Sequence, residues 1–513
     1  MNICKYGFVL FVVLILSACG GGGGGGGSTP PGNTTLTITL ASDSPEPKVI
    51  TGSAYQEGFA FTVNANTGTK TISSVSISTN GDPALVAALS LQLTENGTPI
   101  GSVQQVAGSQ ARFTGLSANT GKRFGVLAKV SGSVSWNGER TKKVSFSVSH
   151  GDVVPEGTAT VVGSATSSPM YRERGRVVFP RGVFYDTGYG IHWSPGANIH
   201  RADLETLAAV QLTDDVGQPP FWWVRHGMTP SPDGSRVVFT GYNQNLYIGL
   251  GGVGVPASVG INGSNPTLHT PGVCTSGGVE QTPTYTPDGA FIVYATNCPH
   301  SPYRWDIVAV RTDGSWGFQI TNDTDDDYSP VVSPDGSQVY YLSCGTSAGG
   351  KCVVKAVEVN FAGGYATGTP QAIYGESWNW MPVNHGVATI LYPGKGTNER
   401  YLSSSPDGGK LLVTYKQNNG PYRLGILTLA TRTMLDVGPG RGAYWAKDGR
   451  IVFFRPWWAE EYDSVRPWSE VDTPVPMYFM EDGGQEVRSA PWESCLSANW
   501  DSCAFGLPLF HPL

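Results

Sequence analysis

Charged side chains are scarce in this 513-residue chain, which has 33 lysines and arginines against 40 aspartates and glutamates. They make up 14% of the residues, well below the share of about 25% that is usual in soluble proteins. Long surface helices and coiled coils need charged faces, so the composition argues against both. The net charge of −7 leaves no basic surface for phosphates, which excludes nucleic acid as an expected partner.

Glycine and proline are abundant instead, with 68 glycines and 36 prolines, about a fifth of the chain. Hydrophobic residues reach 40%, enough to bury a large core. Many short strands joined by tight turns would use such a composition. The sequence therefore predicts an all-β protein, and its length allows two or three domains.

The N-terminus has the pattern of an export signal. Lys5 precedes the apolar run Phe8–Leu16, which is too short to cross a bilayer. The Leu-Ser-Ala-Cys sequence that ends at Cys19 resembles a bacterial lipobox, in which the cysteine becomes the lipid-bearing N-terminus. We therefore predict a lipoprotein signal peptide over 1–18 and lipidation at Cys19, with an ordinary signal peptide as the alternative.

A glycine-rich segment over 19–33 follows and offers no side chains for packing, which predicts a flexible tether. Gly20, rather than an aspartate, follows the cysteine. The lipobox resemblance then implies a lipid anchor in the outer membrane of a bacterial cell envelope, on either its periplasmic or its surface face.

Six cysteines remain apart from Cys4 and Cys19, and no Cys-x-x-Cys motif supports a zinc site. An exported protein meets oxidising conditions, which favour disulfides. The six cysteines fall into couples that are close in sequence. We predict three disulfides: Cys274 with Cys298, Cys344 with Cys352, and Cys495 with Cys503.

Residues 34–165 alternate apolar and polar side chains with a period of two, the pattern of half-buried strands. Asn96-Gly97 and Asn137-Gly138 favour two-residue hairpin turns. Seven or eight short strands over this length predict an immunoglobulin-like β-sandwich that acts as a spacer or adhesive module.

A short motif then recurs, each time followed by an apolar strand. Proline presets φ, aspartate bonds forward to backbone amides and glycine takes positive φ, so the motif predicts a hairpin corner. Its aspartates lie 55, 47, 72 and 41 residues apart, close to the length of a four-stranded propeller blade. The motif occurs at Ser231–Gly234, Thr286–Gly289, Ser333–Gly336 and Ser405–Gly408, and in degraded form at Ala446–Gly449.

With a further blade from about residue 176, this repeat predicts a six-bladed β-propeller over 170–490, followed by a disulfide-containing C-terminal tail over 491–513. A seventh blade around 378–398 is the alternative. The segments Pro283–Gly289 and Pro330–Gly336 resemble the repeats of TolB-type propellers. That resemblance implies a six-bladed fold shared by envelope proteins that bind other proteins, by domains of prolyl peptidases and by some enzymes.

Two apparent motifs carry no predicted chemistry. Gly345–Gly349 matches a hydrolase nucleophile elbow, but strand-like sequence and cysteines flank it, so we predict a closed loop. Gly249–Gly254 matches a dinucleotide-binding loop, but Pro256 follows where that fold needs a helix.

Aligning the blades on their motifs places charged and polar residues before each innermost strand, where loops converge at the mouth of the channel. This mouth is the predicted binding site for an envelope protein or a glycan. Plain channel packing is the alternative, and His226 with the nearby carboxylates would otherwise serve a polysaccharide lyase or hydrolase. The candidates are Arg225, His226, Glu280, Gln281, Asp327, Tyr328, Glu399, Arg400 and Arg441.

No catalytic residue is assigned in the predicted binding protein, and no cofactor is expected apart from one candidate cation site. Asp323, Asp325 and Asp327 offer the oxygen ligands that calcium prefers, although their spacing is not that of an EF-hand. A solvated acidic loop is the alternative.

Overall fold

The structure is a computed structural model. It describes residues 33–50, 52, 54–181, 184–186, 191–193, 198–205, 209–213, 223–243, 253–269, 280–297, 304–344, 352–374, 381–383, 386–389, 402–417, 422–454, 476–484, 487–493 and 509–511. The predicted signal peptide, Cys19 and nearly all of the tether lie outside these residues. So do the predicted disulfides Cys274–Cys298 and Cys495–Cys503. Within the described chain, no helix is long and apolar enough to cross a membrane.

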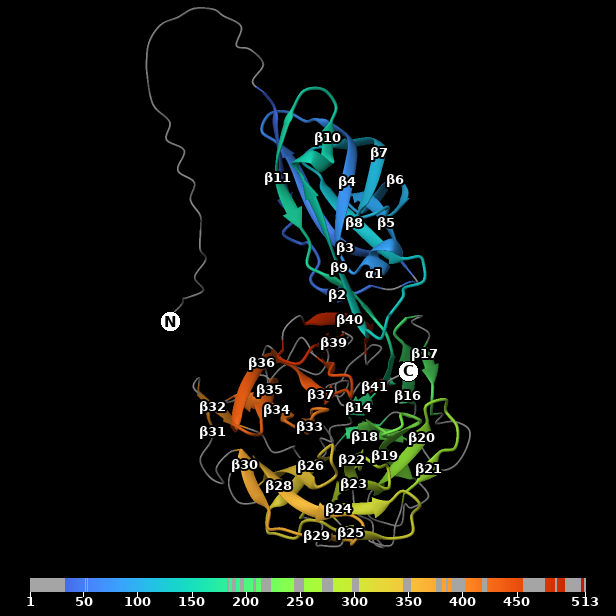
Figure 1. Ribbon diagram of the computed structural model, residues 1–513, viewed down its shortest axis with the longest axis vertical. Coiled ribbons are helices and arrows are strands. Elements are labelled where there is room, and N and C mark those ends of the chain that lie inside the picture. The colour runs from blue at the N-terminus through green and yellow to red at the C-terminus, as the bar shows by residue number, and fades with distance from the viewer. Residues whose placement is uncertain are drawn as a thin grey trace, which may run out of the picture.

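The N-terminal region is a sandwich of two antiparallel sheets (Figure 1). The first sheet consists, in order, of β1 (Thr35–Leu40), β3 (Gln56–Ala65), β8 (Arg123–Val130), β5 (Leu89–Glu95) and β6 (Thr98–Gln105). The second contains β7 (Gln110–Asn119), β4 (Thr71–Gly81), β9 (Thr141–Ser149), β12 (Met170–Glu173) and β2 (Lys48–Val49), with β10 (Val153–Pro155) beside β4. β11 (Thr160–Thr166) pairs with β1 and with β9 and so links the two sheets.

One continuous core fills the space between these sheets. It follows from the predicted alternation, since Val144, Phe146 and Val148 on β9 all point inward. The rings of Phe61 and Phe124 stack at 5.3 Å. A short helix, α1 (Pro83–Ala87), and a 3-10 turn, η1 (His150–Asp152), are the described helical elements. The β-sandwich is thus present, and its immunoglobulin-like character stays a prediction.

Both Asn-Gly pairs form turns, but only Asn96-Gly97 makes the predicted hairpin, because the strands before and after Asn137-Gly138, β8 and β9, pair with other strands. Asn96 and Gly97 have φ of 48° and 82° and connect β5 to β6. Asn137 and Gly138 have φ of 44° and 84°. Positive φ at two successive residues is the mark of a type I′ turn, which asparagine and glycine adopt at low cost.

The second region is a six-bladed β-propeller, as predicted (Figure 1). Blade 2 contains β18 (Trp223–Pro230), β19 (Arg236–Asn243), β20 (Val253–Gly260) and β21 (Thr267–Leu268); blade 3 contains β22 (Glu280–Tyr285), β23 (Phe291–Thr296), β24 (Asp306–Arg311) and β25 (Gly317–Gln319). Blade 4 contains β26 (Asp326–Val332), β27 (Gln338–Cys344), β28 (Cys352–Asn360), β29 (Tyr365–Ala366) and β30 (Gln371–Tyr374).

The strand order within blades 5 and 6 follows the same plan. Blade 5 contains β33 (Leu402–Ser404), β34 (Lys410–Gln417), β35 (Tyr422–Thr428) and β36 (Thr433–Pro439); blade 6 contains β37 (Arg441–Trp445), β38 (Ile451–Phe454), β39 (Pro476–Met480) and β40 (Arg488–Glu493). The hairpin of β31 (Met381–Val383) and β32 (Gly386–Thr389) pairs with β34, so the stretch proposed as a seventh blade extends blade 5.

Blade 1 closes the ring with both ends of the propeller sequence. β13 (Arg176–Arg181) pairs on one side with β16 (Asn198–Asp203), which is followed by β17 (Ala209–Gln211). On its other side β13 pairs with β41 (Leu509–His511). The segment expected to be a C-terminal tail therefore supplies the innermost strand of blade 1. A small hairpin of β14 (Phe184–Asp186) and β15 (Ile191–Trp193) lies outside this sheet.

The buried side chains of the propeller form six clusters, each shared by two neighbouring blades. Adjacent residues on one strand point to opposite faces of the blade and so pack against different neighbouring blades. Val177 of β13 packs toward blade 6, whereas Val178 packs toward blade 2. Each blade sheet is thus apolar on both faces, which explains the continuous apolar runs in the sequence.

The sandwich and the propeller share one sheet, because β2 pairs with β12 and with β40 of blade 6. Val49 packs into the cluster between blades 6 and 1. Beside it, Arg450 Nη1 lies 2.8 Å from Glu173 Oε2, and both side chains are almost fully buried. Asp448 also pairs with Arg450, at 2.7 Å. A buried ion pair therefore joins the two regions.

Candidate functional site

The predicted mouth residues stand near the beginning of the innermost strands. Asp327 and Tyr328 of β26 are both buried, with 0% and 4% of their surface exposed, so neither faces an open mouth. For these two residues the expectation of an accessible binding group is wrong. Arg225, His226, Glu280, Gln281 and Arg441 lie on β18, β22 and β37, and their side chains are outside the described part, as are Glu399 and Arg400 entirely.

Asp327 is held in the interior of blade 4. Burial, with the nearby Asp323 carboxylate, raises the pKa of Asp327 well above its ordinary value, and the Ser343 and Thr321 hydroxyls oppose this only in part. Burial also raises the pKa of Tyr341, with Asp327 as the next cause. Burial therefore disfavours the charged form of Asp327, the form that a cation or a basic ligand would need.

The other two candidate cation ligands, Asp323 and Asp325, both form ion pairs with a lysine. Lys355 Nζ lies 3.0 Å from Asp323 Oδ2 and 3.1 Å from Asp325 Oδ2. Among the residues with described side chains, no three His, Cys, Asp or Glu gather as a metal site requires. The ammonium group therefore stands where the sequence suggested calcium, and the acidic run is a salt-bridged loop.

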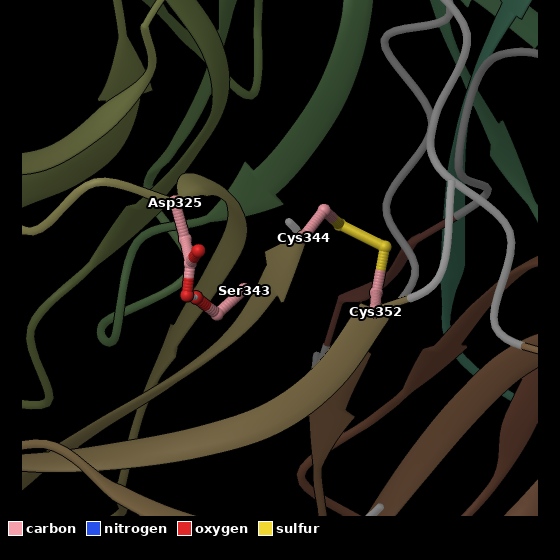
Figure 2. The surroundings of a disulfide bond; sticks show 4 residues. All are labelled: Asp325, Ser343, Cys344 and Cys352. Atoms are coloured by element: carbon pink, nitrogen blue, oxygen red, sulfur yellow. Dashed lines mark hydrogen bonds between the residues drawn. A yellow bond between two sulfur atoms is a disulfide. The ribbon is translucent and has the colours of Figure 1, made fainter. Parts of the chain in front are cut away.

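The loop neighbours the predicted disulfide between Cys344 and Cys352, which is confirmed (Figure 2). The two cysteines are directly paired across β27 and β28. Ser343 donates to Asp325 at 3.4 Å on the adjacent strand end. The disulfide encloses the Gly345–Gly349 segment, which itself lies outside the described residues.

The strand that follows Gly249 bears on the second motif for which the sequence predicts no chemistry, the apparent dinucleotide-binding loop. Residues that follow Gly249 enter β20, which pairs with β19 along its length. A dinucleotide loop would lead into a helix there. The absence of a helix from Val253 to Gly260 confirms that this motif does not form such a site.

The repeated corners meet at the other end of the channel, and the four corners that begin with serine or threonine have the same internal bonds. In the Ser231–Gly234 corner, the Ser231 hydroxyl donates to Asp233 Oδ1 at 2.5 Å and accepts from the Arg236 amide at 2.9 Å. The Ser231 hydroxyl, together with the backbone amide and hydroxyl of Ser235, lowers the pKa of Asp233 to about 2. The corners that begin at Thr286, Ser333 and Ser405 repeat this arrangement.

Neighbouring corners also pack against one another. A methyl group added at Gly289 would lie 3.6 Å from Pro232 Cδ, and one at Gly408 would lie 3.2 Å from Pro334 Cδ. Both glycines have φ near +72°, a conformation that other residues rarely adopt. The glycine and proline of the motif therefore pack neighbouring corners together, in addition to forming each turn. The sequence alone did not reveal this packing.

These corners surround a cavity of about 420 Å³ at the end of the channel. The volume lies in the range of ligand-binding pockets. The second residue of every motif lines it, together with hydroxyl groups and three aromatic residues. Those second residues are Pro232, Pro287, Pro334, Pro406 and Lys447.

Lys447 is the departure from the pattern, because it stands where the other four motifs have proline. Its side chain is exposed, and its Nζ donates to the Pro232 carbonyl at 2.5 Å. Blade 1 has no corner, since its inner strand comes from the C-terminus. Lys447 of blade 6 therefore spans the gap to blade 2.

The structure also contains a serine–histidine contact that the sequence did not suggest. Ser258 Oγ lies 2.9 Å from His269 Nε2, and Arg236 donates to the same oxygen. Both residues are buried, and burial with the nearby Arg236 lowers the pKa of His269 to about 4. This buried pair joins β20 to the residue that follows β21 within blade 2.

No protein-family profile and no curated protein sequence matches this chain. Solved structures do resemble it. TolB from Acinetobacter baumannii is 11% identical over 66% of this chain and 67% of its own, with a TM-score of 0.42. A puromycin-hydrolyzing peptidase from Mycobacterium tuberculosis is 14% identical over 71% and 52%, with a TM-score of 0.37.

An oligogalacturonate lyase from Vibrio parahaemolyticus is 13% identical over 60% of this chain and 74% of its own, with a TM-score of 0.36. Similarity at this level concerns the fold. The function of this propeller must be argued from its own residues.

Proposed function

We propose that this chain is a lipid-anchored protein of the bacterial cell envelope whose propeller binds a partner protein at the corner end of its channel. The observation that carries the proposal is the cavity of about 420 Å³ ringed by the corners. Its walls come from five separate blades, so they are held by the whole ring rather than by one mobile loop. The four motif prolines, Pro230 and three aromatic residues offer apolar contacts to a protein segment.

The anchor and the location rest on the sequence. The export signal that leads to Cys19 supports lipidation, and the glycine-rich tether supports a propeller held at a distance from the membrane. The sandwich supports a spacer role in this scheme, since it is joined to blade 6 through a shared sheet.

Site-specific photocrosslinking in cells tests the proposal. A benzophenone amino acid at Ser404, which lines the cavity, is compared with the same group at Ser315, an exposed turn residue on the outer side of blade 3. We expect a discrete protein adduct from Ser404 alone, and the purified partner should then bind the full chain. Equal adducts from both positions, or none from Ser404, would contradict cavity binding. Cys19→Ser should release the protein from membranes.

A glycan ligand or polysaccharide chemistry is the competing function. It predicts that oligosaccharides raise the melting temperature of the full chain and that the Ser404 position yields no protein adduct. The crosslinking comparison therefore separates the two functions in one experiment.

A further inference from the structure

The cavity has a single charged side chain in its wall. Its lining consists of threonine, serine, proline, valine, tyrosine and tryptophan, with Lys447 as the one charge and no aspartate or glutamate. None of the described carboxylates forms an ion pair with Lys447. In a chain with a net charge of −7, this ammonium group is a local exception.

The acidic residues of the corners are the motif aspartates, and each already has a partner. Asp233 and Asp407 accept hydrogen bonds from the serines of their motifs. In blade 6, Ala446 has no hydroxyl, and Asp448 instead pairs with Arg450 at 2.7 Å. Arg450 also forms an ion pair with Glu173, so the Asp448 carboxylate is drawn toward the sandwich. Lys447 is left to face the cavity without a counter-charge.

The hydroxyl groups of the wall complete the pattern. Thr229 donates to the Pro283 carbonyl and Ser404 to the Ser405 carbonyl. The corner hydroxyls at positions 286 and 405 donate to the motif aspartates and also accept a backbone amide. A hydroxyl whose hydrogen is already used in a hydrogen bond can offer a ligand only the lone pairs of its oxygen. The ligand must therefore bring its own hydrogen-bond donors, and the ammonium of Lys447 selects a negative group.

We propose that the corner-end cavity binds a carboxylate of a peptide segment, with Lys447 as its counter-ion. This inference rests on the proposed function and names its ligand chemistry. Peptide N–H groups supply the donors that the wall lacks, and the four proline rings contact apolar side chains beside the carboxylate. The carboxylate belongs either to an acidic side chain or to a chain terminus, which offer the same chemistry to an ammonium group.

Fluorescence polarisation with labelled hexapeptides and the purified full chain tests this assignment. The first peptide alternates proline and glutamate and is amidated; the second replaces glutamate by glutamine; the third is the glutamine peptide with a free C-terminal carboxylate. We expect the first or the third to bind about tenfold more tightly than the second. Whichever of the two binds identifies the source of the carboxylate.

Three variants assign the effect to Lys447. Lys447→Met should remove the preference, as should Lys447→Pro, which restores the corner of the other blades. Lys447→Arg should keep it. Lys122→Met, at an exposed lysine of the sandwich, is the matched control and should bind like the parent.

Equal affinity for the three peptides, no binding of any of them, or a preference that survives Lys447→Met would overturn the carboxylate assignment. A Lys447-dependent affinity for trigalacturonate in place of the peptides would overturn the peptide class. If the assignment fails while the Ser404 crosslink still captures a protein that binds the full chain, the proposed function stands without it. Loss of that crosslink as well would remove both.

Discussion

The sandwich and the propeller bury their apolar residues in different ways. The sandwich has one core, which all of its strands share. The propeller has six smaller cores, and each belongs to two adjacent blades. A defect in the sandwich is therefore felt by the whole region, whereas a defect in one blade acts first on its neighbours, as in other repeat architectures. The comparison also shows where the two regions depend on each other, namely at Glu173 and Arg450.

The largest expected effect concerns this junction. Arg450→Met should lower the free energy of unfolding by about 3–5 kcal/mol, because it leaves the buried Glu173 carboxylate without its partner. Urea denaturation measures the loss. We expect the unfolding of sandwich and propeller to separate into two transitions, since the buried ion pair between them is lost, although the β2 pairing and the packing of Val49 remain.

The double variant Glu173→Leu with Arg450→Met is the control for that prediction. It removes both charges and should recover part of the lost stability. If the double variant is no more stable than Arg450→Met, loss of packing rather than an unpaired charge explains the effect. Arg112→Met, at an exposed arginine of the sandwich, should change stability little.

A pair of core substitutions compares the two regions directly. Phe124→Ala in the sandwich should cost about 3–5 kcal/mol and Leu342→Ala between blades 4 and 5 about 2–5 kcal/mol. Hydrogen exchange followed by mass spectrometry reports where each defect acts. We expect faster exchange throughout the sandwich for Phe124→Ala, but mainly in blades 4 and 5 for Leu342→Ala. Uniform acceleration around the propeller would contradict independent blade contacts.

The disulfide should contribute less and locally. It closes a loop with a sequence separation of 8, for which the loop-closure estimate is about 2.5 kcal/mol. Replacing both Cys344 and Cys352 by serine should lower stability by about that amount, with faster exchange confined to the adjoining ends of β27 and β28. A loss that spreads to the sandwich would show that the loop has contacts beyond its own blade.

The smallest effect is expected at Asp327, where a substitution should raise the free energy of unfolding rather than lower it. Because burial raises its pKa in the folded state, the folded protein binds more protons than the unfolded chain once the pH exceeds about 4. Asp327 therefore lowers stability as the pH rises from that point, and the loss persists above the folded pKa. Asp327→Asn should be more stable than the parent at pH 7 and nearly equal to it at pH 4, as measured by urea denaturation. Lower stability at pH 7 would show that the electrostatic attraction of the Lys355 ammonium group outweighs burial.

Much of the fold could be predicted because it depends on local patterns. The corner motif gave the blades, since proline, aspartate and glycine have the same backbone effects in every context. Asn96-Gly97 indicated a hairpin for the same reason. Cys344 and Cys352 could be paired because only a short loop separates them.

The binding site was located less well, for a reason that lies in the strand geometry. The motif register correctly aligned Asp327 with the corresponding residues of the other blades, but register does not reveal which side chains turn into a blade contact. Asp327 and Tyr328 turned inward. Ser258 and His269 escaped notice because β21, the short strand beside His269, has no pattern of its own.

The sequence by itself determined the all-β class, the repeat and its turns, because these follow from the preferences of single residues and from a period of two. The tertiary structure decided that β41 completes blade 1, that Lys355 occupies the acidic loop and that Lys447 reaches across the missing corner to Pro232. Each of these contacts joins residues whose partners are chosen by the closing of the ring, and no local preference encodes that choice.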